Sequence, residues 1–318
     1  MDYKAGSDRI EVSVYCPVYN QARYVRRCLD SLVNQKTTFR YEIVVHDDAS
    51  TDGTKEIVLD YAREYPEIIV PVLEKQNIYS QGISIRSAVA PHIRGKYVAV
   101  CEGDDWWTDS NKIQIQWEYM EAHPDCSLCV HEVEKYEATG EKKCGKMAPS
   151  DCERDFKTED MILGDGNMVG TNSMFYKAEH FMLPDCYLGW GVMDYPSCIY
   201  LSTVGKVHYQ HRSMSAYRVS SAGSWSETMQ DDGKRVRHLR AIINGLEAFN
   251  SETKQQYGAA VLDKIGQYQI EVAVITGDLD SLLKGELRDA FKKLPPFARV
   301  KKIMKLKFPR LRRLKITA

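Results

Sequence analysis

Lys96-Tyr-Val-Ala-Val-Cys-Glu-Gly-Asp-Asp-Trp-Trp107 decides how the rest of the chain is interpreted, because it joins an apolar run to an acidic turn. The run that ends at Cys101 has the composition of a buried strand, and Glu102, Asp104 and Asp105 follow it directly. Carboxylates packed this closely repel one another and lose solvation, so they need a cation or a polar ligand. Their oxygens suit a hard divalent metal such as Mg²⁺ or Mn²⁺; an acidic turn that caps the next helix is the alternative.

The composition is that of an ordinary globular protein. The 318 residues are 43% hydrophobic and 27% charged, and the net charge of -1 argues against a global attraction to nucleic acid. The nine cysteines lack the spacing of a disulfide framework, and no apolar run has the length of a membrane span or the form of a signal peptide. We therefore expect a cytoplasmic protein.

Strands and helices alternate before the acidic turn. Strands are predicted at Glu11–Cys16, Tyr41–His46 and Ile68–Leu73, and helices at Arg23–Gln35, Thr54–Glu64 and Gly82–Ala90. This alternation predicts an α/β fold with a mostly parallel, Rossmann-like sheet flanked by helices. Ligands bind outside the carboxyl ends of such strands, so the loops after Cys16, His46 and Cys101 should form one site. The glycine patterns of a dinucleotide site or a P-loop are absent from the sequence.

Several segments, in order, resemble the family 2 glycosyltransferases, which have the GT-A fold and act with inversion. They are Val12–Asn20, Glu42–Thr54, Glu102–Thr108 and Gly191–Pro196, followed by Tyr217-Arg218 with Gly223 and Trp225. The resemblance implies transfer of a sugar from a nucleotide-sugar donor, UDP-linked, to a glycan or lipid-linked acceptor in cell-surface polysaccharide synthesis. A sugar nucleotidyltransferase and an inactive nucleotide-binding domain are the alternatives. The first would carry a glycine-rich basic loop after the first strand, which is missing, and the intact acids argue against the second.

The resemblance also implies a donor site. Pro17, Tyr19 and Asn20 would pack against the nucleotide base, and Asp48 would hydrogen-bond the uracil. Asp104 and Asp105 would contact the ribose and the metal. Arg86 and Arg218 would contact the diphosphate. Glu102 stands where the family motif begins with Asp, which leaves the detailed coordination open. Asp48 could instead cap the following helix, and Arg86 could lie on a solvated helix face.

Asp194 matches the family's general-base position, although it could equally be the N-cap of the helix that Pro196 begins. One carboxylate that takes the acceptor proton, with Mn²⁺ or Mg²⁺ stabilising the leaving diphosphate, fits direct displacement with inversion. Trp190, between two glycines, would contact the acceptor. Trp225 would stack on the acceptor or on the nucleotide, or would pack in the core.

We expect three regions: a GT-A domain at 9–228, a helical region at 229–290 and a basic amphipathic tail at 291–318. Residues 135–158 should form an irregular excursion, because they are polar and lack periodicity. In the tail, Val300, Ile303, Met304 and Leu306 alternate with cations, as in an interfacial amphipathic helix. This pattern predicts peripheral attachment to the inner leaflet of a membrane, with a solvated tail as the alternative, and no nucleic-acid partner.

Overall fold

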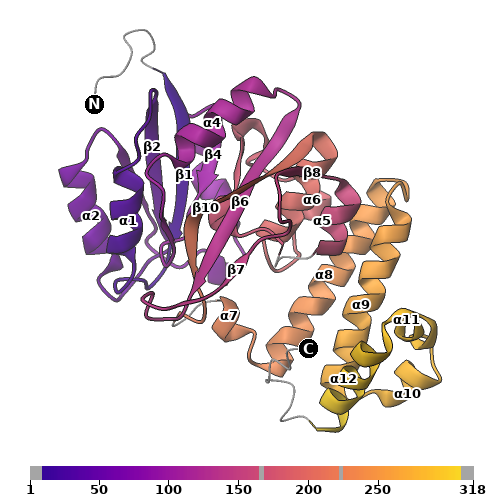
Figure 1. Ribbon diagram of the computed structural model, residues 1–318. Coiled ribbons are helices and arrows are strands. Elements are labelled where there is room, and N and C mark those ends of the chain that lie inside the picture. Colours follow the sequence, from indigo (N-terminus) through magenta and orange to yellow (C-terminus); the bar gives the residue numbers. More distant parts are fainter. Residues whose placement is uncertain (1–8, 165–167, 222–224, 309–318) are drawn as a thin grey trace. The chain divides into compact units, whose positions relative to one another are not determined.

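The computed structural model describes residues 9–164, 168–221 and 225–308 (Figure 1). The chain forms two compact units, and each is described by itself. The first contains the residues up to Lys157 together with Gly166–Leu183 and Ser197–Gly223; the second contains Thr158–Asp165, Pro184–Pro196 and the chain from Ser224 onward. Two segments from within the predicted GT-A domain therefore belong with the C-terminal helices.

A mixed sheet forms the first unit, in the order β3-β2-β1-β4-β9-β6-β10-β5, with β7 beside β6 and β8 beside β10. The strands are β1 (Ile10–Val18), β2 (Arg40–Asp47), β3 (Ile69–Leu73), β4 (Tyr97–Val100), β5 (Trp106–Trp107), β6 (Cys126–Tyr136), β7 (Lys143–Met147), β8 (Arg154–Phe156), β9 (Phe175–Lys177) and β10 (Lys206–Arg218). The first four strands pair in parallel, as predicted. The second half adds antiparallel pairings of β9 with β4 and β6, around the parallel pair of β6 and β10. The predicted α/β class is confirmed.

The parallel register brings the carboxyl ends of the central strands to one edge of the sheet. In the middle of β1, Tyr15 lies opposite Val100 of β4, and at its end Val18 lies opposite Asp47 of β2. These strands are rich in β-branched residues and almost entirely buried, which suits a sheet covered on both faces. The loops that follow β1, β2 and β4 consequently leave the sheet side by side.

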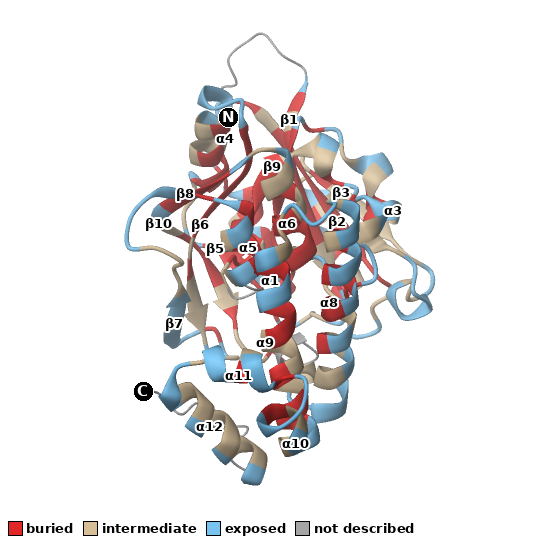
Figure 2. Ribbon diagram, turned by 90° about the vertical axis from the view of Figure 1, so that its right-hand side faces the viewer, coloured by how far each residue is buried: buried red, intermediate tan, exposed pale blue. Residues whose placement is uncertain are grey.

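Helices cover this sheet, and their buried residues recur at helical spacing. The helices are α1 (Val25–Val33), α2 (Thr54–Glu64), α3 (Ile85–Val89), α4 (Lys112–Ala122) and most of α6 (Asp194–Val204). On α1, the residues Val25, Cys28, Leu29 and Leu32 are fully buried and form one stripe. This stripe packs in one core with residues of β1, β2 and β4, three strands whose residues are almost all buried; Figure 2 colours buried residues red.

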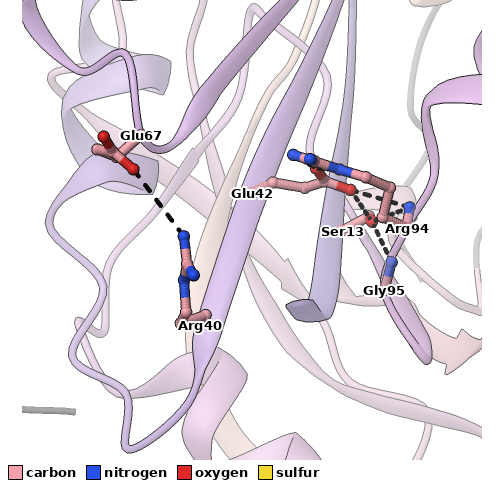
Figure 3. Close-up of polar contacts among 6 residues, drawn as sticks. All are labelled: Ser13, Arg40, Glu42, Glu67, Arg94 and Gly95. Carbon is pink, nitrogen blue, oxygen red and sulfur yellow. Dashed lines mark hydrogen bonds and ion pairs between the residues drawn. The ribbon is translucent and has the colours of Figure 1, made fainter. Parts of the chain in front are cut away.

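A buried polar network holds the opposite end of the same strands (Figure 3). Ser13 of β1 donates to Glu42 Oε1 of β2 at 2.6 Å, and the Arg94 guanidinium Nε donates to Glu42 Oε2 at 2.6 Å. The Gly95 N–H donates to Ser13 Oγ at 2.8 Å, and a side chain at Gly95 would overlap the backbone of β1. Because Glu42 is fully buried, these donors are what its carboxylate needs.

The expectation of an irregular excursion at residues 135–158 is wrong in two places. β7 pairs with β6, and β8 pairs with β10, both antiparallel. The residues of β7 are almost all exposed, so an edge strand of this kind has no alternation of apolar and polar residues to reveal it.

The second unit is helical. It contains α5 (Thr158–Gly164), α7 (Trp225–Thr228), α8 (Asp232–Glu252), α9 (Gly258–Thr276), α10 (Leu279–Leu283), α11 (Arg288–Lys293) and α12 (Pro296–Lys307). Asp231 caps α8 by accepting the Lys234 N–H at 2.7 Å, and Gly277 ends α9 with φ 85°. In the described parts of the chain, every helix is too short or too polar to cross a lipid bilayer.

Candidate active site

The structure brings together the three loops that the sequence predicts to form one site. The Asp48 N–H in the loop after β2 donates to the Val18 carbonyl at 3.1 Å, and the Gly103 N–H in the acidic turn donates to the Pro17 carbonyl at 3.1 Å. The loop after β1 therefore lies between the other two. It carries Tyr19, which is 48% exposed at this edge of the sheet.

Asn20 and Asp52 fix the loop after β1 against the loop after β2. Asn20 has the left-handed φ of 50°, a conformation that Asn tolerates, and its Oδ1 accepts the Thr51 N–H at 2.8 Å. Asp52 accepts the Ala22 N–H at 2.9 Å and the Thr54 N–H at 3.0 Å. Asp52, rather than Asp48, thus caps the start of α2.

Asp48 is buried, and its carboxylate holds a third segment at the same edge. Its two oxygens accept the backbone N–H groups of Ile78 at 2.7 Å and Tyr79 at 3.2 Å. This contact fixes the short helical turn η1 (Tyr79–Gln81), on which Tyr79 is 67% exposed. The carboxylate of Asp48 therefore has a structural role, and its uracil contact stays a prediction.

The acidic turn separates its carboxylates. Asp105 is buried, and its oxygens accept the Arg218 N–H at 2.9 Å and the Asn172 side-chain amide at 2.8 Å. Burial raises the pKa of Asp105 well above its usual value, and the nearby Asp104 and Glu102 raise it further. Asp105 consequently faces the interior, and its predicted contact with the ribose or a metal stays a prediction.

Asp104 and Glu102, by contrast, are half-buried at the sheet edge. One oxygen of Asp104 accepts the Ser221 hydroxyl at 2.6 Å. Between the two acids, a side chain at Gly103 would overlap Val18 and Gln21 of the loop after β1, so only glycine allows this close approach. The turn therefore has Glu102 and Asp104 half-buried at the sheet edge and Asp105 buried in the interior.

Arg218 supports the acidic turn through hydrogen bonds, and its side chain is buried. Its Nε donates to the Asp104 carbonyl at 2.9 Å and its Nη1 to the Ala138 carbonyl at 3.0 Å. Its guanidinium lies 5.0 Å from the centre of the Trp106 ring, which Arg27 approaches to 3.6 Å. These contacts make Arg218 a support of the acidic turn, and its diphosphate contact stays a prediction.

Arg86 is also buried, which contradicts the solvated helix face; its diphosphate contact stays a prediction. Its Nη1 donates to the Phe181 carbonyl at 2.9 Å, and its Nη2 to the Ser197 hydroxyl at 2.9 Å. The guanidinium thereby joins α3 to two later segments of the first unit.

Asn172 is a residue of this site that the sequence did not reveal. It is fully buried, and besides Asp105 its amide donates to the Ala216 carbonyl at 3.0 Å while its oxygen accepts the Ser215 hydroxyl at 2.7 Å. Its backbone carbonyl accepts the Trp107 indole N–H at 3.1 Å. Asn172 thus ties Asp105, at the end of the acidic turn, and Trp107, just after it, to β10. It lies on the short helical turn η3 (Thr171–Ser173), and no spacing in the sequence pairs this segment with the acidic turn.

In the second unit, Asp194 is half-buried at the first residue of α6, and its Oδ1 accepts the N–H of Tyr195 at 2.7 Å. Gly189 and Gly191 both have the left-handed φ, at 77° and 75°, which explains the glycine on each side of Trp190. The Trp190 ring is fully buried and packs against the helix α8, and its acceptor contact stays a prediction. The side chain of Trp225 lies outside the described residues.

A sheet of this order, with an acidic turn after a central parallel strand, defines the GT-A class of folds. Two solved structures agree. Staphylococcus aureus TarS 1–349 in complex with UDP-GlcNAc has a TM-score of 0.60 at 14% identity, covering 95% of this chain and 83% of that one. The mannosyltransferase PcManGT from Pyrobaculum calidifontis, in complex with GDP-Man and Mn²⁺, has a TM-score of 0.53 at 16% identity, covering 95% and 88%. At these identities the likeness concerns the fold alone.

The sequence pattern of glycosyl transferase family 2 matches residues 13–183, which is more than half of the chain, and the chain belongs to this family. An uncharacterized protein of Mycobacterium bovis is 31% identical over 225 residues, which are 70% of this chain; the chain spans 63% of that relative's length. The putative teichuronic acid biosynthesis glycosyltransferase TuaG of Bacillus subtilis is 33% identical over 109 residues, which are 34% of this chain and 41% of TuaG.

The carboxylate oxygens at the turn have the chemistry that a hard divalent metal prefers. Among the described residues no group of three or more His, Cys, Asp or Glu side chains could hold a metal ion. Glu102 and Asp104 nevertheless supply hard oxygen ligands at the sheet edge, and Mg²⁺ is characteristically held by one or two carboxylates together with substrate phosphates. A shared site of this kind fits the residues that are present.

Proposed function

We propose that the protein transfers a sugar from a nucleoside diphosphate donor, UDP-linked, to a hydroxyl group of a glycan or lipid-linked acceptor. The observation that carries this proposal is the meeting of the three strand-end loops, with Glu102 and Asp104 as the acids left at the edge. TarS supports a UDP-sugar, because it has the same fold and was solved with UDP-GlcNAc. TuaG, whose name assigns it to teichuronic acid biosynthesis, supports a role in cell-surface polysaccharide synthesis.

On the donor side, the exposed Tyr19 would pack against the base, beside Pro17 and Asn20. Asp48 would accept the uracil N–H; a carboxylate has about four acceptor positions, so the two backbone donors leave room for a third. Asp104 and Glu102 would hold Mn²⁺ or Mg²⁺, which when bound stabilises the negative charge of the leaving diphosphate. In this assignment Asp105 and Arg218 keep the turn in place.

Asp194 would take the proton from the acceptor hydroxyl as that oxygen attacks the sugar. Its position at the start of α6 supports this role, because the backbone N–H of Tyr195 fixes one carboxylate oxygen. A single base without a carboxylate nucleophile gives inversion of configuration. We place the reaction at the cytoplasmic face of the inner membrane, where lipid-linked acceptors would lie.

Donor binding is tested by calorimetric titration of UDP and UDP-GlcNAc with Mn²⁺, with Mg²⁺ and with EDTA. Asp104→Asn should weaken metal-dependent binding by about 10-fold or more, because it removes a charged ligand. Asp60→Asn, at an acid on the surface of α2, is the matched control. Failure of UDP and UDP-GlcNAc to bind with either metal would refute the UDP assignment.

The base is tested separately by following sugar transfer to a membrane extract. Asp194→Asn should abolish transfer while donor affinity stays at its native value, and Asp185→Asn, at an exposed acid of the same unit, should leave both unchanged. Transfer at the native rate by Asp194→Asn would show that another group accepts the proton.

A further inference from the structure

The helix α12 has two apolar sides, and one of them is already covered within the second unit. Ile303 and Leu306 pack against a core formed by α9, α10 and α11. On the same side, Lys302 Nζ donates to Glu271 Oε2 of α9 at 2.6 Å, and Arg235 of α8 donates to the other oxygen at 2.5 Å. One apolar face and one ion pair therefore fix α12 to the unit.

The other apolar side is open. Phe297 is 57% exposed, Val300 54%, Met304 42%, and Phe308, directly after the helix, 57%. Their spacing of three and then four residues places them on one face of a helix. Figure 2 shows α12 in tan and pale blue, and none of its residues is buried. The sequence pattern had grouped Val300 and Met304 with Ile303 and Leu306; the structure assigns the two pairs to opposite sides.

Cations border this open stripe. By helical position Lys301 and Lys305 lie along one side of it and Lys307 along the other. Lys292 and Lys293, at the end of α11, are exposed. After Asp289 the sequence contains eleven Lys and Arg residues and no acid. A stripe of large apolar side chains bordered by lysines is the pattern of a helix that lies in the interface of an anionic membrane.

We propose that the outward face of α12, formed by Phe297, Val300, Met304 and Phe308, docks the protein onto an anionic lipid surface. The apolar side chains enter the boundary between headgroups and acyl chains, and the bordering lysines meet the headgroup charge. A second copy of this chain would bring the same cations against each other, so charge complementarity favours the lipid. Nucleic acid would match the cations but would leave the apolar stripe uncovered. The inference rests on the proposed function only for the choice of membrane, since the exposed face and its charges are independent of the donor site.

The test uses the full chain and flotation with vesicles of phosphatidylcholine alone or with phosphatidylglycerol. We expect binding to the anionic vesicles and little to the neutral ones, with a several-fold loss when the salt is raised from about 0.1 to about 0.5 M. The triple variant Phe297→Ser, Val300→Ser, Met304→Ser should lower the partition coefficient on the order of 10- to 100-fold. Leu262→Ser, at a 65% exposed leucine of α9 in the same unit, is the matched control and should bind like the native protein.

Native binding by the triple variant would overturn the proposal, and so would equal binding to neutral and anionic vesicles by the native protein. A concentration-dependent dimer in analytical ultracentrifugation that the triple variant abolishes would also overturn it, because the face would then be a subunit interface. The salt and lipid dependence of the native protein keeps the test decisive if the variant unfolds. UDP-sugar titration of the same samples separates the two proposals: lost vesicle binding with intact donor binding contradicts only the docking surface.

Discussion

Replacing Lys112 by methionine should change how the stability of the first unit depends on pH. Lys112 begins α4 and is fully buried; its Nζ donates to Gln116 Oε1 at 2.7 Å and lies 4.2 Å from the centre of the Trp107 ring. Burial lowers the pKa of Lys112 to about 7, and Cys101 and Cys129 offset this only in part. The amine thus lies between Trp107 and Gln116, in an environment that disfavours its charge.

The sign of the effect follows from proton linkage. Between pH 7 and the unfolded pKa of about 10.4, the unfolded chain binds this proton and the folded chain does not. The free energy of unfolding of the native protein therefore rises with pH, by up to about 1.4 kcal/mol per pH unit. Below pH 7 the full difference applies, and keeping the charge in the fold costs about 4 to 5 kcal/mol. Lys112→Met removes that cost but leaves Gln116 Oε1 without its donor, which costs about 1 to 3 kcal/mol.

The variant should therefore be more stable than the native protein at pH 6.5 and lose this advantage steadily toward pH 9. Burial raises the pKa of the Cys101 and Cys129 thiols, which makes stability fall at high pH, but burial is the largest cause of both shifts and acts in both proteins, so the thiols contribute little to the difference. Urea unfolding read by hydrogen exchange of peptides from β1 and β4 reports the first unit alone. Lys36→Met, which removes an exposed cation of the same unit, controls for the loss of one charge. A stability difference that is constant from pH 6.5 to 9 would refute the reasoning.

Two further substitutions test the supports of the candidate site and of the second unit. Asn172→Ala should destabilise the first unit by about 2 to 4 kcal/mol, because it leaves buried partners such as Asp105 unsatisfied, and donor titration should show weaker metal-dependent binding although no ligand contact is removed. Gly245→Ala should destabilise the second unit by about 1 to 3 kcal/mol in thermal unfolding, because the new methyl group would overlap the Trp190 ring. Gly258→Ala, where the nearest atoms lie 3.5 Å away, should be neutral or slightly stabilising.

The sequence was sufficient to predict the sheet edge because topology alone determines it. Parallel strands with short crossovers must bring their carboxyl ends together, so the loops after Cys16, His46 and Cys101 could be placed without any side-chain detail. The direction of individual side chains could not be predicted in this way. Asp104 and Asp105 are neighbours of the same type, and which of them faces inward depends on donors from Asn172 and Arg218, which are remote in the sequence.

The burial of Arg86 and Arg218 could not be predicted for a related reason. Arginines close to a predicted anion site suggest a phosphate contact, and the sequence does not reveal that backbone carbonyls already accept hydrogen bonds from them. Arg218 donates to Asp104 and Ala138, and Arg86 to Phe181. Carbonyl partners of this kind carry no side-chain signature, so only the fold identifies them.

The division of the acids explains how so acidic a turn can persist before any cation binds. Three carboxylates within four residues repel one another unless donors neutralise them. Asp105 meets two fixed donors, and its burial favours the protonated form, so it adds less repulsion to Glu102 and Asp104 than a third exposed carboxylate would. Glu102 and Asp104 are then held on a turn whose position is fixed by the hydrogen bonds from Asn172 and Arg218 to Asp105. If this account is right, loosening the support at Asn172 lowers the affinity for a divalent cation while both candidate ligands remain unchanged in sequence.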